Sequence, residues 1–103
     1  MVYVIWTDEA INDLRKIKDY LVRVADEKTA RRFCLALFSA PDRLRRFPKS
    51  GQVVLEFQIE AVREVLFRDY RIIYQVAEGA CYIRTVVHGS RELQQHIDPS
   101  DWD

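Results

Sequence analysis

Four ionisable side chains in the second half of the sequence could together form a site for acid–base chemistry. They are a carboxylate, two guanidinium groups and an imidazole, contributed by Glu56, Arg71, Arg84 and His88. A carboxylate and an imidazole can give and take protons, and guanidinium groups stabilise negative charge. Such a site requires that the four side chains lie on one surface, so the surrounding chain has to bring them together.

The residues around them predict the sheet that would do so. Three apolar runs, 62–67, 70–77 and 80–87, are separated only by the pairs Arg68-Asp69 and Glu78-Gly79. Short runs rich in Val, Ile, Tyr and Phe that are joined by two-residue breaks are typical of an antiparallel meander. We therefore expect three consecutive antiparallel strands in the last third of the chain.

Alternation of side chains along the last two runs predicts which residues share a face. The face expected to pack against helices consists of Tyr70, Ile72, Tyr74, Val76, Cys81, Ile83, Thr85 and Val87. The opposite, partly polar face consists of Arg71, Ile73, Gln75, Tyr82, Arg84, Val86 and His88. Residues 53–59, in which apolar and polar side chains also alternate, predict either a full strand or an extended, partly irregular entry into the sheet. Glu56 joins the polar face if this segment adds to the sheet with its apolar side on the same core.

These charges also have a purely structural explanation. Outward arginines are what any antiparallel sheet with one wet face shows, and Arg63 or Arg71 could form ion pairs with Glu56 or Glu64. His88 would then make a structural hydrogen bond at the end of a strand. The residues alone leave both explanations open.

The first half of the chain predicts a short strand followed by a helical hairpin. Residues 2–6 are apolar, and Thr7 can cap a helix with apolar residues every three or four positions over 11–24. Asp26 can cap a second helix. Pro41 is expected to interrupt this helix near residue 40, because proline lacks a backbone donor, and to leave a short continuation beyond it.

These elements predict one α+β domain that spans residues 1–103. Its N-terminal strand and helical hairpin would pack on one face of a twisted, mainly antiparallel sheet. Residues 92–97 are expected to form one or two turns of helix, and an acidic tail follows them.

Composition limits the classes of function. The chain has 16 basic and 16 acidic residues and therefore no net charge, whereas proteins that bind nucleic-acid phosphates usually carry an excess of Lys and Arg. Cys34 and Cys81 stand at apolar positions without a CxxC pattern, so we expect buried free thiols and no metal or cofactor. The N-terminus lacks a basic leader and no apolar stretch is long enough for a membrane. These features favour the cytoplasm.

Six short motifs follow one another in order along the chain: Trp6-Thr7-Asp8, Leu14-x-x-Ile17-x-x-Tyr20, Phe47-Pro48-x-x-Gly51, Arg63-Glu64, Tyr70-Arg71-Ile72-Ile73-Tyr74 and Val86-Val87-His88-Gly89-Ser90-Arg91. In order and spacing they resemble the RelE/ParE superfamily of bacterial toxins, which includes the plasmid-stabilisation proteins. The resemblance covers nearly the whole chain. It implies a helical hairpin on a twisted antiparallel sheet and a toxin of a type II toxin–antitoxin pair.

Two mechanisms exist in that superfamily. ParE-like members poison DNA gyrase and need no catalytic residues, and the ending His88-Gly89-Ser90-Arg91 resembles that branch, which we favour. RelE-like members cleave mRNA on the ribosome. For that alternative the resemblance implies Glu56 as general base, Arg71 as the group that stabilises the phosphorane, and His88 as general acid.

The RNA-cleaving alternative fits this chain less well than the gyrase poison. The catalytic tyrosine that often lies near the C-terminus of such nucleases has no match here, and zero net charge suits ribosomal RNA poorly. We therefore favour a toxin without enzymatic activity over the alternative of an endoribonuclease. Further candidates for the functional face are Arg63, Tyr82, Arg84 and Arg91.

The resemblance also implies a partner common to both mechanisms, a cognate antitoxin that wraps the toxin in a hetero-oligomer. An antitoxin helix would lie against the helical hairpin and a following strand could add to a sheet edge. Candidate contacts for an acidic antitoxin tail are the basic residues Arg31, Arg32, Arg43, Arg45 and Arg46.

Overall fold

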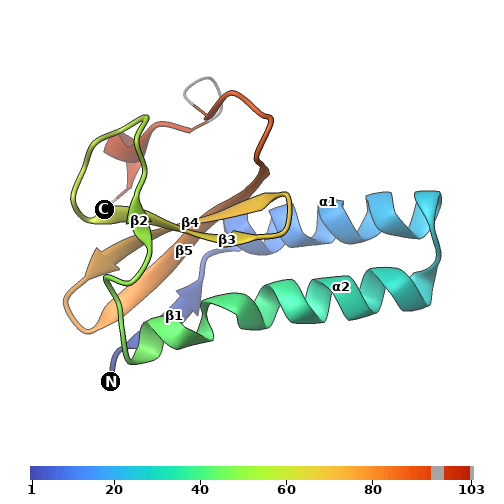
Figure 1. Ribbon diagram of the computed structural model, residues 1–103, viewed down its shortest axis with the longest axis horizontal. Coiled ribbons are helices and arrows are strands. Elements are labelled where there is room, and N and C mark those ends of the chain that lie inside the picture. Colours follow the sequence, from blue (N-terminus) through green and yellow to red (C-terminus); the bar gives the residue numbers. More distant parts are fainter. Residues whose placement is uncertain (94–96, 103) are drawn as a thin grey trace.

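The computed structural model describes residues 1–93 and 97–102, and a helical hairpin packs on one face of a five-stranded sheet (Figure 1). The elements in chain order are β1 (Tyr3–Trp6), α1 (Asp8–Val24), α2 (Glu27–Ser39), the 3-10 helix η1 (Ala40–Arg45), β2 (Gln52–Val53), β3 (Val62–Phe67), β4 (Tyr70–Ala77), β5 (Ala80–His88) and the 3-10 helix η3 (Pro99–Asp101). The strand order is β1-β5-β4-β3-β2. Only β1 runs parallel to its neighbour, so the predicted fold is confirmed.

The helices begin and end where the sequence predicts. The Thr7 side chain accepts a hydrogen bond from the Ala10 amide at the start of α1, and the Asp26 side chain accepts one from the Thr29 amide at the start of α2. Pro41 ends α2, and the chain continues as the 3-10 helix η1. No helix of the described residues is long and apolar enough to cross a membrane.

The predicted face assignment holds for β4 but fails near the end of β5. Tyr74 pairs with Ile83, whereas Ile73 pairs with Thr85, so Arg84 is an extra residue and β5 contains a β-bulge. An extra residue reverses the faces of all residues that follow it. Val86, predicted for the polar face, therefore lies in the core beneath the helices.

Val87 is reversed in the same way and lies in a second core on the opposite face of the sheet. The segment before β3 and the segment after β5 cover this core. Its residues are Val54, Phe57, Val62, Ile73, Val87, Leu93, Ile97 and Trp102. The sheet therefore has an apolar core on each face rather than one wet face. The predicted helix over 92–97 falls largely on residues 94–96, which lie outside the described part of the chain.

The predicted alternation over 53–59 is wrong. Only Gln52–Val53 forms a strand, and the chain turns at residues 55–57. Val54 is buried and Leu55 is 76% exposed, the reverse of the predicted pattern. Gln58, with a positive φ of 53°, lies in the turn of this segment, which explains why an extended strand does not form.

A buried tyrosine joins the turn before β2 to the sheet. The Tyr74 hydroxyl donates to the Pro48 carbonyl at 2.8 Å and accepts from the Gly51 amide at 3.0 Å. A Cβ at Gly51 would stand 2.5 Å from the Glu64 carbonyl oxygen, so only glycine allows this approach. The pair of hydrogen bonds fixes where the chain enters β2.

We predict that Tyr74→Phe lowers the free energy of unfolding by about 1–3 kcal/mol, because it removes the hydroxyl partner of a buried amide and of a partly buried carbonyl. Urea denaturation followed by circular dichroism measures the change. Tyr3→Phe is the control, since Tyr3 is 73% exposed and its substitution should leave stability unchanged. Equal stability of Tyr74→Phe and the parent protein would contradict the role of the hydroxyl.

Candidate functional site

The guanidinium of Arg71 is held between two carboxylates on the face away from the helices. Its Nη1 and Nη2 donate to the two oxygens of Glu56 at 2.7 and 2.9 Å. Its Nε and Nη2 donate to the two oxygens of Glu64 at 2.6 and 3.2 Å. The side chains of Arg71, Glu56 and Glu64 are 14%, 31% and 10% exposed. Glu56 thus contacts Arg71, as predicted, and Glu64 contributes a second carboxylate.

These contacts lower the pKa of the Glu56 carboxyl to about 2, because it accepts hydrogen bonds from Arg71 and faces its positive charge. They raise the pKa of Arg71, since the guanidinium donates first to Glu56 and also to Glu64. A carboxylate of such low basicity is a weak general base near neutral pH. A guanidinium bound by two carboxylates has no charge left over for a third anion.

Arg63 makes contacts of a structural kind. Its Nη1 donates to the carbonyls of Lys49 and Gly51, and its Nε and Nη2 donate to the carbonyl and carboxylate of Glu60. These bonds hold the turns on both sides of β2 against β3. Arg63 therefore supports the segment that carries Glu56.

Arg84 and Tyr82 lie on the predicted face but in a separate group from Arg71. The Arg84 guanidinium donates to the Gln75 side chain at 3.0 and 2.7 Å and stacks over the rings of Tyr82 and Trp102. Ile73, buried in the second core, stands between Arg71 and Gln75 on β4. The two arginines therefore serve different clusters.

The prediction that His88 shares a face with Arg71 and Arg84 is wrong. Because of the bulge, His88 pairs with Tyr70, and the two rings meet edge to face at 5.4 Å. Arg71 instead pairs with Val87, on the opposite face. The His88 Nδ1 also contacts the Ser90 hydroxyl at 2.7 Å. The three residues proposed for RNA cleavage are not brought together.

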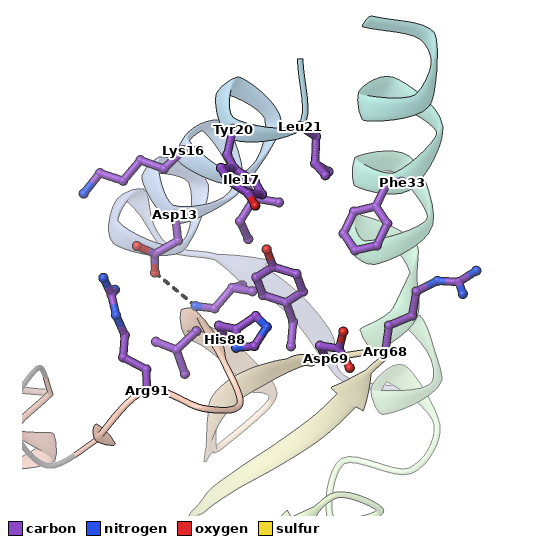
Figure 2. Close-up of a pocket in the computed structure, with 13 residues that line it drawn as sticks. Asp13, Lys16, Ile17, Tyr20, Leu21, Phe33, Arg68, Asp69, His88 and Arg91 are labelled. Carbon is purple, nitrogen blue, oxygen red and sulfur yellow. Dashed lines mark hydrogen bonds between the residues drawn. The ribbon is translucent and has the colours of Figure 1, made fainter. Parts of the chain in front are cut away.

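His88 lines a pocket that the sequence did not reveal (Figure 2). The pocket has a volume of about 670 Å³ and lies between α1, α2, the Arg68-Asp69 turn and the end of β5. Arg91, a predicted candidate, also lines it. The bulge turns His88 to this face of the sheet, where it lines the pocket. No pattern in the sequence marks the bulge.

Asp13 of α1 borders the pocket and holds the bulge in place. Its Oδ2 accepts from the Thr85 hydroxyl at 2.7 Å and from the Val86 amide at 3.0 Å. The carboxylate points toward the end of β5 (Figure 2). Its position on the helix, one turn before Ile17, is the one signal that could have indicated a contact with the sheet.

The basic residues proposed for an acidic partner lie on the surface of α2, of η1 and of the residue that follows η1. All five are exposed, and they are Arg31, Arg32, Arg43, Arg45 and Arg46. Arg31 pairs with Glu27 at 3.2 Å, and Arg45 approaches Asp42 at 4.0 Å. The described residues contain no cluster of three or more metal-binding side chains, and both cysteines are buried free thiols, as predicted.

Two solved structures share this fold. A structure of the chromosomal ParDE toxin–antitoxin system from P. aeruginosa matches 85% of this chain and 96% of that chain, with a TM-score of 0.74 and 20% identity. The toxin–antitoxin complex RelBE2 from Mycobacterium tuberculosis matches 84% and 90%, with a TM-score of 0.59 and 19% identity. At these identities the likeness concerns the fold alone. The helical hairpin on a mixed sheet is thus also present in these two structures.

Sequence comparison defines the family. The family described as the ParE toxin of type II toxin–antitoxin system, parDE, matches residues 4–93. Toxin RelE2 of Caulobacter vibrioides is 34% identical over 92 residues, which make up 88% of this chain and 99% of that protein. The chain belongs to the ParE toxin family of type II toxin–antitoxin systems. The predicted membership of the RelE/ParE superfamily is confirmed.

We predict that Glu56→Gln destabilises the fold at neutral pH but not in acid. The folded-state pKa of Glu56 is about 2 against an ordinary 4.5, so its ionised form contributes stability above pH 4.5 that is lost as the pH falls toward 2. After allowance for solvent screening, the loss at pH 7 should be about 1 kcal/mol.

Urea unfolding at several pH values measures this difference between the variant and the parent protein. The difference should shrink steadily below pH 4.5. Glu78→Gln, at the exposed turn between β4 and β5, is the matched control and should show no such change. A difference that stays constant down to pH 2 would contradict the assigned ion pair.

Proposed function

We propose that this toxin acts by binding and poisoning DNA gyrase, without catalytic residues of its own. The observation that carries the proposal is the arrangement around Arg71. Two carboxylates neutralise its guanidinium, and His88 stands on the other face of the sheet. Cleavage of RNA would need a free base, a free cation and an acid around one phosphate. The net charge of zero and the match to the ParE toxin family support the same conclusion.

We predict that the purified protein inhibits supercoiling by DNA gyrase and causes cleaved DNA to accumulate. Agarose-gel assays of supercoiling and cleavage measure both effects, and induced expression in bacteria should produce DNA damage before translation stops. Glu56→Gln and His88→Gln should keep their toxicity, because neither group performs chemistry in this mechanism. Unchanged gyrase activity at a large molar excess of toxin would refute the proposal.

One observation favours a second candidate function. The relative that is 34% identical to this chain is named Toxin RelE2, and RelE-like toxins are the RNA-cleaving branch in the resemblance described above. In this alternative, binding of a phosphate would have to draw Arg71 away from its carboxylates. The toxin would then cut mRNA in purified ribosome complexes, and Glu56→Gln and His88→Gln would each abolish the cleavage. Uncut mRNA in that assay would eliminate this alternative.

We also propose that a cognate antitoxin neutralises the toxin, as a hetero-oligomer. The two solved structures described above are both of toxin–antitoxin systems. The exposed arginines of η1 and the residue after it offer positive charge to an acidic antitoxin segment. A small acidic protein with a DNA-binding N-terminal part, encoded beside the toxin, is the expected partner.

We predict that co-expression of this neighbouring protein abolishes toxicity. The charge reversals Arg43→Glu, Arg45→Glu and Arg46→Glu, introduced together, should weaken the purified complex by about tenfold, because they replace attraction by repulsion. Isothermal titration calorimetry measures the affinity. Lys28→Glu, an exposed cation in the first turn of α2, provides the comparison and should bind like the parent protein. If the triple variant binds as tightly as the parent protein, this surface is not part of the interface.

A further inference from the structure

The second helix of the hairpin carries two large apolar side chains that the core does not bury. The residues that α2 buries are Ala30, Cys34 and Leu37. Leu35 and Phe38 are instead 61% and 43% exposed. The Phe38 ring stacks on the ring of Trp6 in β1 with a centroid distance of 4.9 Å, so its position is fixed. A helix that packs on a core usually has polar side chains elsewhere, so this apolar surface points to a contact with another protein.

Opposite charges flank the two apolar residues. Arg31 lies four positions before Leu35 in α2, and Asp42 lies four positions after Phe38 in η1. Helical residues that are three or four positions apart stand on the same side. The side chains of Arg31 and Asp42 are 65% and 60% exposed, and each forms a surface ion pair within its own helix. We refer to Arg31, Leu35, Phe38 and Asp42 as the α2 stripe.

The α2 stripe is complementary to the same stripe of a second copy. In an antiparallel pairing about a twofold axis, Leu35 of each copy faces Phe38 of the other. Arg31 of each copy then faces Asp42 of the other, because each lies four positions outside the apolar pair. In a parallel pairing Arg31 would meet Arg31 and Asp42 would meet Asp42. Charge therefore selects the antiparallel arrangement.

The rest of the molecule leaves this side of α2 accessible. The helix runs along one side of the molecule, with α1 on its other side (Figure 1). Phe33, the α2 residue that lines the pocket beside His88, stands two positions before Leu35 and hence on the opposite side of the helix. Arg71 and its carboxylates lie on the sheet face away from the helices. A contact through the α2 stripe would therefore cover neither of these regions.

We propose that the toxin pairs with a second copy of itself through the α2 stripe, as an antiparallel twofold dimer. The inference depends on neither gyrase nor an antitoxin, because it concerns the toxin alone. An interface made by one helix of each copy is smaller than the roughly 1,600 Å² of a typical stable complex. We therefore expect a dissociation constant of about 10–100 μM.

Sedimentation equilibrium of the purified toxin over a range of concentrations tests for the dimer. The parent protein should be mainly dimeric at about 1 mM, and Leu35→Glu should be monomeric at that concentration. Leu55→Glu is the matched control, because Leu55 is 76% exposed and lies outside the α2 stripe, and it should pair like the parent protein. Circular dichroism should show the same folded spectrum for all three proteins. A parent protein that stays monomeric at about 1 mM would overturn the proposal.

An exchange of charges between two variants tests the antiparallel register. Arg31→Asp and Asp42→Arg should each weaken pairing by at least about tenfold, because like charges then meet at both ends of the stripe. An equimolar mixture of the two variants should form a mixed dimer, since each end then joins opposite charges. Arg32→Asp, at the neighbouring exposed position outside the stripe, should pair like the parent protein. If the two stripe variants pair as tightly as the parent protein, or if their mixture stays monomeric, the proposed pairing is wrong.

Discussion

The β-bulge at Arg84 is the constraint on which the rest of this structure depends. One extra residue in β5 exchanges the two faces of the sheet for every residue after it. The bulge also frees a backbone amide, and Asp13 of α1 accepts from it and from the neighbouring Thr85 hydroxyl. The hydrogen bonds to Asp13 therefore join the helical hairpin to the shifted strand, and they satisfy polar groups that would otherwise be costly to bury.

The exchange of faces gives the molecule two cores and separates two groups of charged side chains. Val86 completes the core beneath the helices, and Val87 completes the smaller core on the opposite face. His88 is thereby placed beside Tyr70 at the pocket between the helices and the end of β5. Arg71 remains on the other face with its carboxylates. A site that needs both the imidazole and the guanidinium at one phosphate does not form in this arrangement.

Charge is used differently in these two regions. Around Arg71 the charges are paired at short range and largely shielded from water, so their main effect is to hold β3, β4 and the segment after β2 together. Around the pocket between the helices and the end of β5, the cations Lys16, Arg68 and Arg91 form no salt bridge with the residues that the structure describes. Paired charges with low exposure suit a structural role.

Local signals in the sequence were sufficient for most of the fold. The caps at Thr7 and Asp26, the break at Pro41 and the three apolar runs each act within a few residues, and all appear as predicted. The approach of Glu56 to Arg71 also followed from charge and alternation, although the segment that carries Glu56 is a turn rather than a strand.

Tertiary structure alone decided where the end of β5 faces. Alternation assumes an unbroken strand, and nothing near Arg84 in the sequence marks an extra residue. The partner that stabilises the bulge, Asp13, lies 72 and 73 residues away from Thr85 and Val86. The sequence by itself therefore determined the elements and the family of this toxin. The packing of α1 on β5 determined which of its charged side chains meet, because that choice depends on a contact between distant parts of the chain.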